Sequence, residues 1–311
     1  MATRGNRRAT VIARTAFGTA TLRPDPARAL GWELLVDGVA QSYVDLGDAT
    51  FLDFEYVRRV GSVLRLAAPA AVPIRVLHLG GGGLTLPRLV SATRPGSAQR
   101  VVERDGELVA LVTRELPLAT PVEITVGDAT LGESTVRDAT PVEITVGDAT
   151  LGENTVRDAT PVEITVGDAR AALAQAEPAA YDVIVVDVFD GARIPASVAG
   201  VGFARAAARV LRPGGLLAMN LTDVPPLAYS RVQVATLAEA FSDVGLIAGG
   251  GMFRGRKAGN VILVAGHAAG DLPVRALALD AARDPVPGRV VHGADLDKFR
   301  AGAKARLDEP A

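Results

Sequence analysis

Short β-branched runs alternate with longer helical segments from residue 74 to residue 266, and this alternation most restricts the possible fold. The predicted strands are 74–80, 99–105, 162–168, 181–187, 215–221 and 260–266. The predicted helices are 85–93, 105–116, 169–176, 202–211 and 229–242. Continuous apolar strands that alternate with helices are typical of a parallel sheet that is covered on both faces. We therefore predict an α/β domain over residues 71–270.

The segments on either side of this region have a different character. Residues 30–70 combine alternating apolar positions with a turn signal at Asp37–Gly38, which indicates a small β-rich domain that ends in a helix from about Phe51. Residues 1–29 begin with several arginines and are expected to form a basic arm. Residues 271–311 are rich in alanine, proline, arginine and aspartate, and we expect a loosely packed C-terminal extension.

A tandem repeat interrupts the regular pattern. Residues 119–138 recur at 139–158 with a single change, and their first half recurs once more at 159–168. Two and a half copies are too few for a stacked solenoid, so we interpret 119–158 as a duplication inserted into the fold. The third copy directly precedes the next predicted helix and is predicted to fill the strand position. The other copies are expected either to extend the edge of the sheet or to form an excursion from it.

Composition excludes several classes of protein and site. The chain has 33 basic and 35 acidic residues, a formal net charge of −2, which argues against general binding to nucleic acid. It has no cysteine and three widely spaced histidines, so we expect neither disulfides nor a metal site. No apolar run approaches the ~18–20 residues of a membrane span, so no membrane partner is expected. We expect a soluble, cytoplasmic protein.

Three successive strand ends carry residues that suit a nucleoside. The glycines after the first strand, where a helix begins and backbone N–H groups are free, are Gly80, Gly81, Gly82 and Gly83. Glu103 ends the second strand, where a carboxylate can accept hydrogen bonds from ribose hydroxyls. Asp168, followed by Ala169, ends the third and can both accept from an adenine amine and cap the next helix. The pattern indicates an adenosine-bearing ligand without distinguishing a dinucleotide from S-adenosylmethionine.

The segment 181–195 carries two further acids at the predicted crevice. Asp187 and Asp190 stand where the fourth strand leaves the sheet. Two carboxylates beside a ligand can hold an amine by charge and accept its proton as it attacks. Asp182 begins the same strand at the opposite end, and we interpret it as structural. His78 lies inside the first strand and is expected to be buried and hydrogen-bonded.

From Trp32 to Gly266 the chain resembles the spermidine synthase-like polyamine aminopropyltransferases. The motifs that carry the resemblance are VDGVAQS, LGGGG, VVERD, VGDA, DVIVVDVFDG and GNVILVAG, together with the region of Tyr56. The resemblance implies a Rossmann-like, S-adenosylmethionine-dependent methyltransferase fold with a small N-terminal β-rich domain. It also implies transfer of an aminopropyl group from decarboxylated S-adenosylmethionine to a small amine acceptor. Homodimers are common in the family.

The resemblance also implies roles for individual residues. Those that it places against the nucleoside donor, beside the glycine loop, are Gln41, Glu103, Asp168 and Ala169. It makes Asp187 the catalytic acid–base residue and uses Asp190 to help anchor the amine. Tyr56 would line the acceptor side, and no metal takes part.

Two positions depart from the family pattern. Spermidine synthases carry an aspartate in the glycine loop, GGGDG, which grips the amino group of the donor, whereas this chain has Gly83 there. They usually carry an acid beyond the tyrosine, whereas Arg58 and Arg59 stand here, and arginine repels a polyamine at short range. Two alternatives therefore stay open. One is a methyltransferase that uses ordinary S-adenosylmethionine on an unknown acceptor, and the other is a catalytically decayed nucleoside-binding or scaffold protein.

Overall fold

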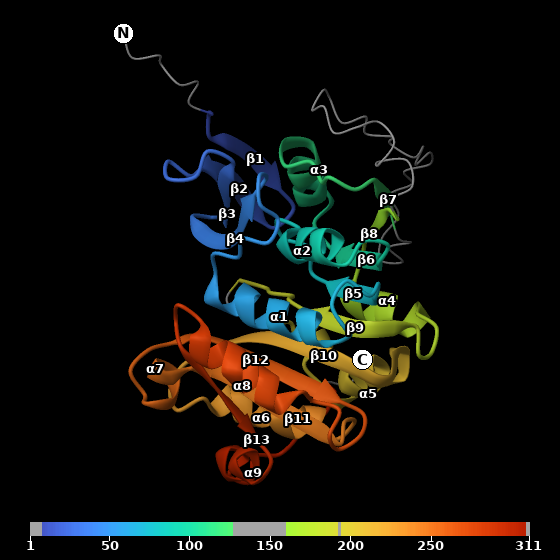
Figure 1. The fold of residues 1–311 in the computed structure, drawn as a ribbon, viewed down its shortest axis with the longest axis vertical. Coiled ribbons are helices and arrows are strands. Elements are labelled where there is room, and N and C mark those ends of the chain that lie inside the picture. The colour runs from blue at the N-terminus through green and yellow to red at the C-terminus, as the bar shows by residue number, and fades with distance from the viewer. Residues whose placement is uncertain (1–7, 127–159, 192–193, 309–311) are drawn as a thin grey trace.

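The computed structural model describes residues 8–126, 160–191 and 194–308, which form two β-sheets (Figure 1). The smaller sheet is an antiparallel meander at one end of the molecule. Its strands are β1 (Val11–Thr15), β2 (Gly18–Pro24), β3 (Gly31–Val36) and β4 (Val39–Asp45). Asp37 and Gly38 join the last two with φ of 49° and 78°, the conformation of a tight type I′ turn. The predicted turn is confirmed.

Residues 11–24, which were expected to belong to a basic arm, form strands β1 and β2 of the small sheet. Alternate side chains of β2 point inward, so that Ala20 and Leu22 are fully buried. They pack in one cluster with Leu111 and Val112 of α3 (Gly106–Glu115). The expectation of an arm over residues 1–29 is therefore wrong for 11–24, because the arginine-rich composition concealed the alternation that buries one face of this strand.

The larger sheet has nine strands in the order β13-β11-β12-β10-β9-β5-β6-β8-β7. Their bounds are β5 Arg75–Leu79, β6 Ala98–Glu103, β7 Val122–Val126, β8 Val162–Val166, β9 Tyr181–Val186, β10 Leu211–Asp223, β11 Asp243–Gly249, β12 Gly259–Gly266 and β13 Gly288–His292. The strands from β10 to β7 are mutually parallel, whereas β12 runs antiparallel to both of its neighbours. All six predicted strands are present, and the predicted α/β, Rossmann-like fold class with its N-terminal β-rich unit is confirmed.

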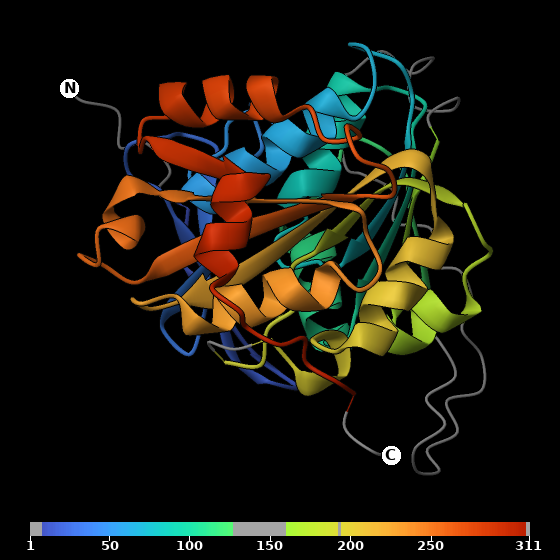
Figure 2. The ribbon, with the colours of Figure 1, turned by 90° about the horizontal axis from the view of Figure 1, so that it is seen from below.

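Helices cover both faces of this sheet (Figure 2). On one face lie α1 (Glu55–Leu66), α2 (Thr85–Thr93) and α8 (Val274–Arg283), and on the other α4 (Ala169–Gln175), α5 (Val201–Val210) and α6 (Ala228–Leu237). The shorter elements are η1 (Ala196–Val198), α7 (Gly250–Phe253) and α9 (Ala294–Arg300). The helix expected from Phe51 begins at Glu55. No helix in the described ranges is long and apolar enough to span a membrane.

The C-terminal segment is part of the folded body. β13 pairs antiparallel with β11, and α8 buries Leu277 and Ala281 against the sheet. Beyond α9, Asp308 accepts a hydrogen bond from the backbone N–H of Gly202 at 2.7 Å. The expectation of a loose extension over residues 271–311 is therefore wrong for its described part, because the helical spacing of the apolar residues matters more than their low number.

The repeat copies lie at one edge of the large sheet. The third copy forms β8 beside β6, which confirms the predicted strand assignment. The first copy forms β7 and pairs with β8 in parallel, with identical residues opposite each other, such as Val122 with Val162 and Ile124 with Ile164. Of the two expectations, extension of the sheet edge is therefore the one that the first copy fulfils. The second copy lies outside the described residues.

Candidate active site

A cavity of about 840 Å³ opens at the carboxyl ends of the parallel strands, where they face β3 and β4. The chain runs outward from β5 to β6 on one side and from β9 to β10 on the other, so the strand order reverses between β5 and β9. Open α/β sheets bind ligands in the crevice at such a reversal. The volume also falls in the usual range of ligand pockets, about 300–1,000 Å³.

The glycine loop after β5 is tied to the end of β6. Gly80 has φ of 95°, and a Cβ atom there would lie 2.2 Å from the carbonyl oxygen of Asp187, so only glycine fits. The N–H groups of Gly81 and Gly82 donate to Oε2 of Glu103 at 2.8 and 3.4 Å. These three glycines and Glu103 line the cavity together.

Gly83 lies one position further along and is not part of the cavity wall. Its N–H donates to Oγ of Ser42 at 3.0 Å. A Cβ atom on Gly83 would lie 2.9 Å from Cβ of Ser42 and 3.1 Å from Cγ2 of Val44. A side chain as large as aspartate therefore does not fit at this position unless β4 moves.

Asp168 and Ala169 also lie outside the cavity wall. Oδ1 of Asp168 accepts from the backbone N–H of Ala171 at 2.9 Å and so caps α4, while Ala169 is buried. The structure gives Asp168 the capping role that its position predicts. It does not bring these two residues together with the glycine loop around the cavity.

Asp187 belongs to a hydrogen-bond network at the end of β9. Its Oδ1 accepts from Nδ2 of Asn220 at 2.8 Å, and Oδ1 of Asn220 accepts from Nδ2 of Asn260 at 3.0 Å. The hydroxyl of Tyr56 donates to the carbonyl oxygen of Gln41 at 3.1 Å, and hydrogen bonding by Tyr56 lowers the pKa of Asp187. All five residues line the cavity.

The sequence analysis did not predict Asn220 or Asn260 as site residues. Asn220 comes from β10, and Asn260 is the second residue of β12, whose antiparallel direction brings its first residues beside the last residues of β10. Each is a polar residue at the crevice end of an apolar strand. Because a polar side chain in such a run needs a partner, this pattern could have identified both.

The surroundings of Asp187 make it a stronger base than an exposed aspartate. Burial raises its pKa; the hydrogen bonds from Asn220 and Tyr56 act in the opposite direction without reversing the shift, and the charge of Glu103 adds to the rise. The pKa of Tyr56 is raised well above its usual value, first by burial and then by the charge of Asp187. A half-buried carboxylate with a raised pKa is suited to accept a proton from an amine.

Asp190 lies at the rim of the cavity on the loop after β9. Its side chain is 72% exposed and contacts the guanidinium of Arg104 at 3.4 Å. The same guanidinium lies 3.8 Å from the ring centroid of Phe17, which comes from the β1–β2 turn. Arg104 therefore links the small sheet to the loop after β9 across the cavity mouth.

Arg58 is compensated by an acid from the far end of the chain. Its Nε and Nη2 donate to the two carboxylate oxygens of Asp284 at 2.6 and 3.0 Å, and the Asp284 side chain is only 7% exposed. Burial raises the pKa of Asp284, but the hydrogen bonds from Arg58 and from the N–H of Val286, together with the charges of Arg58 and Arg59, outweigh it, so the pKa is lowered. The expectation that Arg58 repels a cationic substrate is therefore corrected, because its charge is neutralised by a partner 226 positions away.

Carboxylates outnumber guanidinium groups in the cavity wall as far as the structure describes it. The acids are Asp37, Asp53, Glu55, Glu103, Asp105, Asp187 and Asp190, and the arginines are Arg58 and Arg104. Such a wall attracts cations. In the described ranges, no group of three or more histidine, aspartate or glutamate residues is arranged to hold a metal ion.

Solved structures with the same architecture include several spermidine synthases. A probable spermidine synthase from Corynebacterium glutamicum matches with a TM-score of 0.78 and 28% identity, over 98% of both chains. The enzyme from Thermotoga maritima matches with a TM-score of 0.51 and 13% identity, over 88% of this chain and 78% of that one. A spermidine synthase in complex with the transition-state analogue AdoDATO matches with a TM-score of 0.50 and 12% identity, over 88% of this chain and 77% of that one. No protein-family model and no curated protein gives a significant match.

Proposed function

The chain is spermidine synthase-like in structure, and on this basis we propose that it transfers an aminopropyl group from decarboxylated S-adenosylmethionine to an amine acceptor. The observation that carries the proposal is the half-buried Asp187, held by Asn220 and Tyr56 in an acid-lined cavity at the sheet crevice. In this reaction, the acceptor nitrogen attacks the carbon next to the sulfonium. The carbon–sulfur bond breaks, its electron pair goes to sulfur, and Asp187 accepts the proton from nitrogen.

The donor would lie at the glycine-loop end of the cavity. Glu103 already accepts from Gly81 through Oε2 and from the N–H of Asp105 through Oε1 at 3.1 Å, which fixes the carboxylate in one orientation. A carboxylate oxygen accepts more than one hydrogen bond, so ribose hydroxyls can bind to it as well. Gln41, on β4 in the opposite wall of the cavity, would contact the donor from the other side.

The acceptor would lie between Tyr56, Asp187 and the rim. Asp53 lines this part of the cavity with an exposed carboxylate, and Asp190 stands at the mouth. Because both the sulfonium donor and a protonated amine are cations, excess carboxylates favour binding of each. The same acids hold the two cations close together, so that binding energy contributes to alignment.

Methyl transfer from ordinary S-adenosylmethionine is a second candidate, and the glycine loop favours it. Gly80, Gly81 and Gly82 line the cavity without a carboxylate, and Ser42 and Val44 lie too close to Gly83 for an aspartate to be added there. The loop itself therefore offers no acid that would repel the carboxylate of this donor. The intact network around Asp187 supports retained catalysis over a decayed scaffold.

Calorimetric titration with the two donors tests the proposal. We expect decarboxylated S-adenosylmethionine to bind, and an amine to be extended by an aminopropyl group when both substrates are present. Binding of the carboxylated form alone would overturn aminopropyl transfer in favour of methyl transfer. If neither nucleoside binds, the protein is a scaffold and both reactions are excluded.

A further inference from the structure

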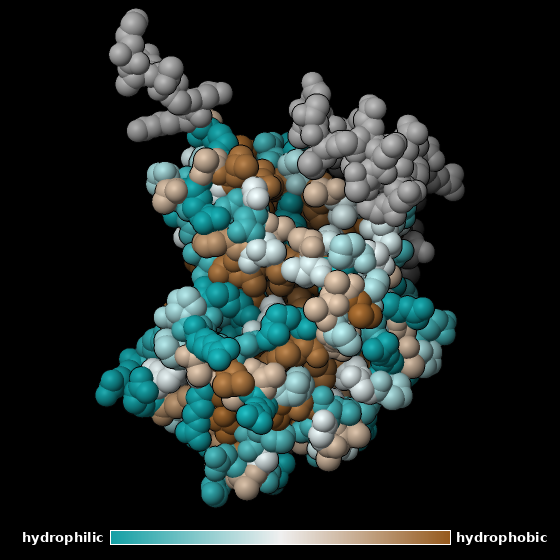
Figure 3. Space-filling view, in the orientation of Figure 1, coloured by the Kyte–Doolittle hydropathy of each residue, from teal (hydrophilic) through white to brown (hydrophobic). Residues whose placement is uncertain are grey.

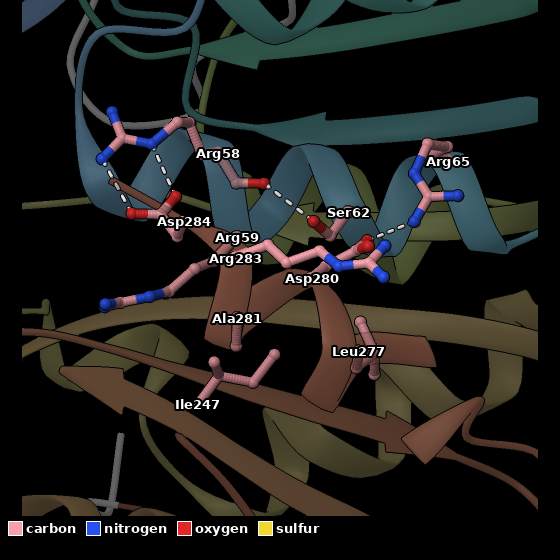
Figure 4. A pocket seen from close by; sticks show the side chains of 10 residues that line it. All are labelled: Arg58, Arg59, Ser62, Arg65, Ile247, Leu277, Asp280, Ala281, Arg283 and Asp284. Atoms are coloured by element: carbon pink, nitrogen blue, oxygen red, sulfur yellow. Dashed lines mark hydrogen bonds and ion pairs between the residues drawn. The ribbon is translucent and has the colours of Figure 1, made fainter. Parts of the chain in front are cut away.

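A second pocket, of about 270 Å³, lies between α1 and α8 and is separate from the acid-lined cavity (Figure 4). Its floor is apolar and is formed by Ile247 of β11 with Leu277 and Ala281 of α8. Its rim is charged, and Figure 3 shows hydrophilic residues gathered along the line where the two helices meet. An apolar floor under a charged rim suits a small molecule that has one ionic group.

Two ion pairs join the helices at either end of this pocket. Figure 4 shows Arg58 paired with Asp284 at one end and Arg65 paired with Asp280 at the other. Ser62 lies between them and donates its hydroxyl to the backbone oxygen of Arg58 at 3.2 Å. The charges of Arg58 and Arg65 are therefore compensated within the protein.

The other two arginines of the rim lack full partners. Arg59 is 2% exposed, and its Nε has no hydrogen-bond partner. Its Nη1 donates to Glu55 at 3.2 Å, and its Nη2 reaches the carbonyl oxygen of Val286 only at 3.5 Å. In the described part of the chain, the guanidinium of Arg283 forms no hydrogen bond or ion pair. Buried polar groups normally have partners, so the unpaired Nε of Arg59 is an exception. The guanidinium of Arg283 is exposed, and its donors are open to a ligand.

We infer that the pocket binds a small organic oxyanion, in which a phosphate or carboxylate group is attached to a compact apolar body. The oxyanion would accept from the Arg283 guanidinium, whose planar donors match two oxygens at once. The apolar body would cover Ile247 and Leu277. The anionic group of the ligand would then contact the charged rim, and its apolar body would contact the apolar floor.

Arg58 connects this pocket to the acid-lined cavity, because it lines both. Because Asp284 already compensates Arg58, the charge of a bound anion adds to the negative potential of the acid-lined cavity. A cationic acceptor would then bind more tightly, and by linkage the acceptor would tighten binding of the anion. This coupling rests on the proposed function, whereas binding of the anion does not.

Titration calorimetry with phenyl phosphate and benzoate, at constant ionic strength, tests the inference on the full chain. We expect saturable binding of at least one probe, and the stronger probe identifies the anionic group. Arg283→Ala should weaken binding by about tenfold or more, as expected for loss of a charge-assisted, two-point contact. The matched control is Arg275→Ala, which removes an exposed arginine from the same helix outside the pocket.

Three results would overturn the inference: no saturable binding of either probe, unchanged affinity in Arg283→Ala, or equal losses in Arg283→Ala and Arg275→Ala. Arg283→Lys separates charge from geometry, because lysine keeps the charge without the planar fork. We expect it to recover only part of the affinity. Since the readout is binding to the free protein, failure of the proposed transfer reaction leaves this test intact.

Discussion

The two ends of the acid-lined cavity are built in different ways. At the donor end, backbone N–H groups of the glycine loop bind Glu103, which ends the next strand along the chain. At the acceptor end, side chains from distant segments meet, as Tyr56, Asp187 and Asn220 do. Backbone geometry fixes the first end, and side-chain contacts across the fold fix the second. Single side-chain substitutions can therefore change the acceptor end, whereas the donor end depends on the backbone of the glycine loop.

Asp187→Asn should have the largest effect and act on the acceptor end alone. Asparagine keeps the shape but cannot accept the proton, so we expect turnover to fall by about 10³-fold. Donor affinity should change less than about twofold, as measured by calorimetry. The control is Asp295→Asn, an exposed acid on α9 that should leave both quantities unchanged. Parallel loss of turnover and donor affinity would show that the two ends are not separable.

Gly80→Ala tests whether the backbone geometry of the glycine loop fixes the donor end. The new Cβ would lie 2.2 Å from a backbone oxygen at a φ of 95°, so we expect a loss of about 3 kcal/mol or more in the free energy of unfolding. Gly214→Ala is the matched control, because Gly214 has φ of 73° with open space around it. It should cost about 1 kcal/mol from strain alone. Equal losses in denaturant unfolding would contradict the role of the close contact.

Asp284→Asn tests the ion pair behind the acceptor end. Removal of a largely buried partner leaves Arg58 uncompensated, and we expect a loss of roughly 2–3 kcal/mol in stability and a higher KM for a cationic acceptor. Asp295→Asn again provides the contrast, since it breaks an exposed pair with Arg289 and should cost less than about 0.5 kcal/mol.

The sign of the pH dependence follows from the lowered pKa of Asp284. The stabilisation by this group is complete above the ordinary aspartate pKa and is lost as the pH falls through the lower, folded-state value. Asp284→Asn should therefore flatten the acid limb of a stability profile. An unchanged acid limb would assign that limb to other carboxylates.

Asn220→Ala should shift the pH profile of turnover rather than abolish turnover. Because the pKa of Asp187 is raised, activity should be low in acid and rise as this carboxyl ionises. The bond from Asn220 favours the ionised form, so its loss should move the acid limb to higher pH. The measurement is kcat against pH. A uniform loss at all pH values would indicate a structural role for Asn220.

Deletion of residues 119–138 should have the smallest effect. The deletion leaves β8 and everything inward of it unchanged in sequence, so we expect a change below about 1 kcal/mol in unfolding free energy and unaltered donor affinity. Denaturant unfolding and calorimetry would check both. Unfolding of the deletion variant would show that the first copy is an integral part of the core.

Sequence reasoning succeeded where structure is local and failed where it depends on distant contacts. The strands and helices around the glycine loop could be predicted because apolar periodicity and glycine placement are properties of short segments. Asp308 and β13 could not, since their partners lie across the fold in residues that no nearby pattern indicates. Composition was a poor guide at both ends of the chain, where few apolar residues still bury one face.

In the candidate site, too, local sequence patterns predicted some residues correctly and missed the contacts that place others. Gly80–Gly82 and Glu103 were expected at a crevice and lie together in its wall. Gly83 and Asp168 were expected there too, but close contact with Ser42 and the capping of α4 place them outside it. The position of a residue at a strand end predicts the edge of the sheet at which it lies, but not whether its side chain faces the cavity.

The identical pairing of β7 with β8 has a consequence for how such proteins evolve. Residues added to a packed interior are destabilising, because such an interior has no free space for them. Here Val122–Val126 pair with their own duplicates, Val162–Val166, and the added strand lies at the edge of the described sheet. The border of this sheet is thus a place where the protein can lengthen by a whole strand while its ancestral centre stays intact.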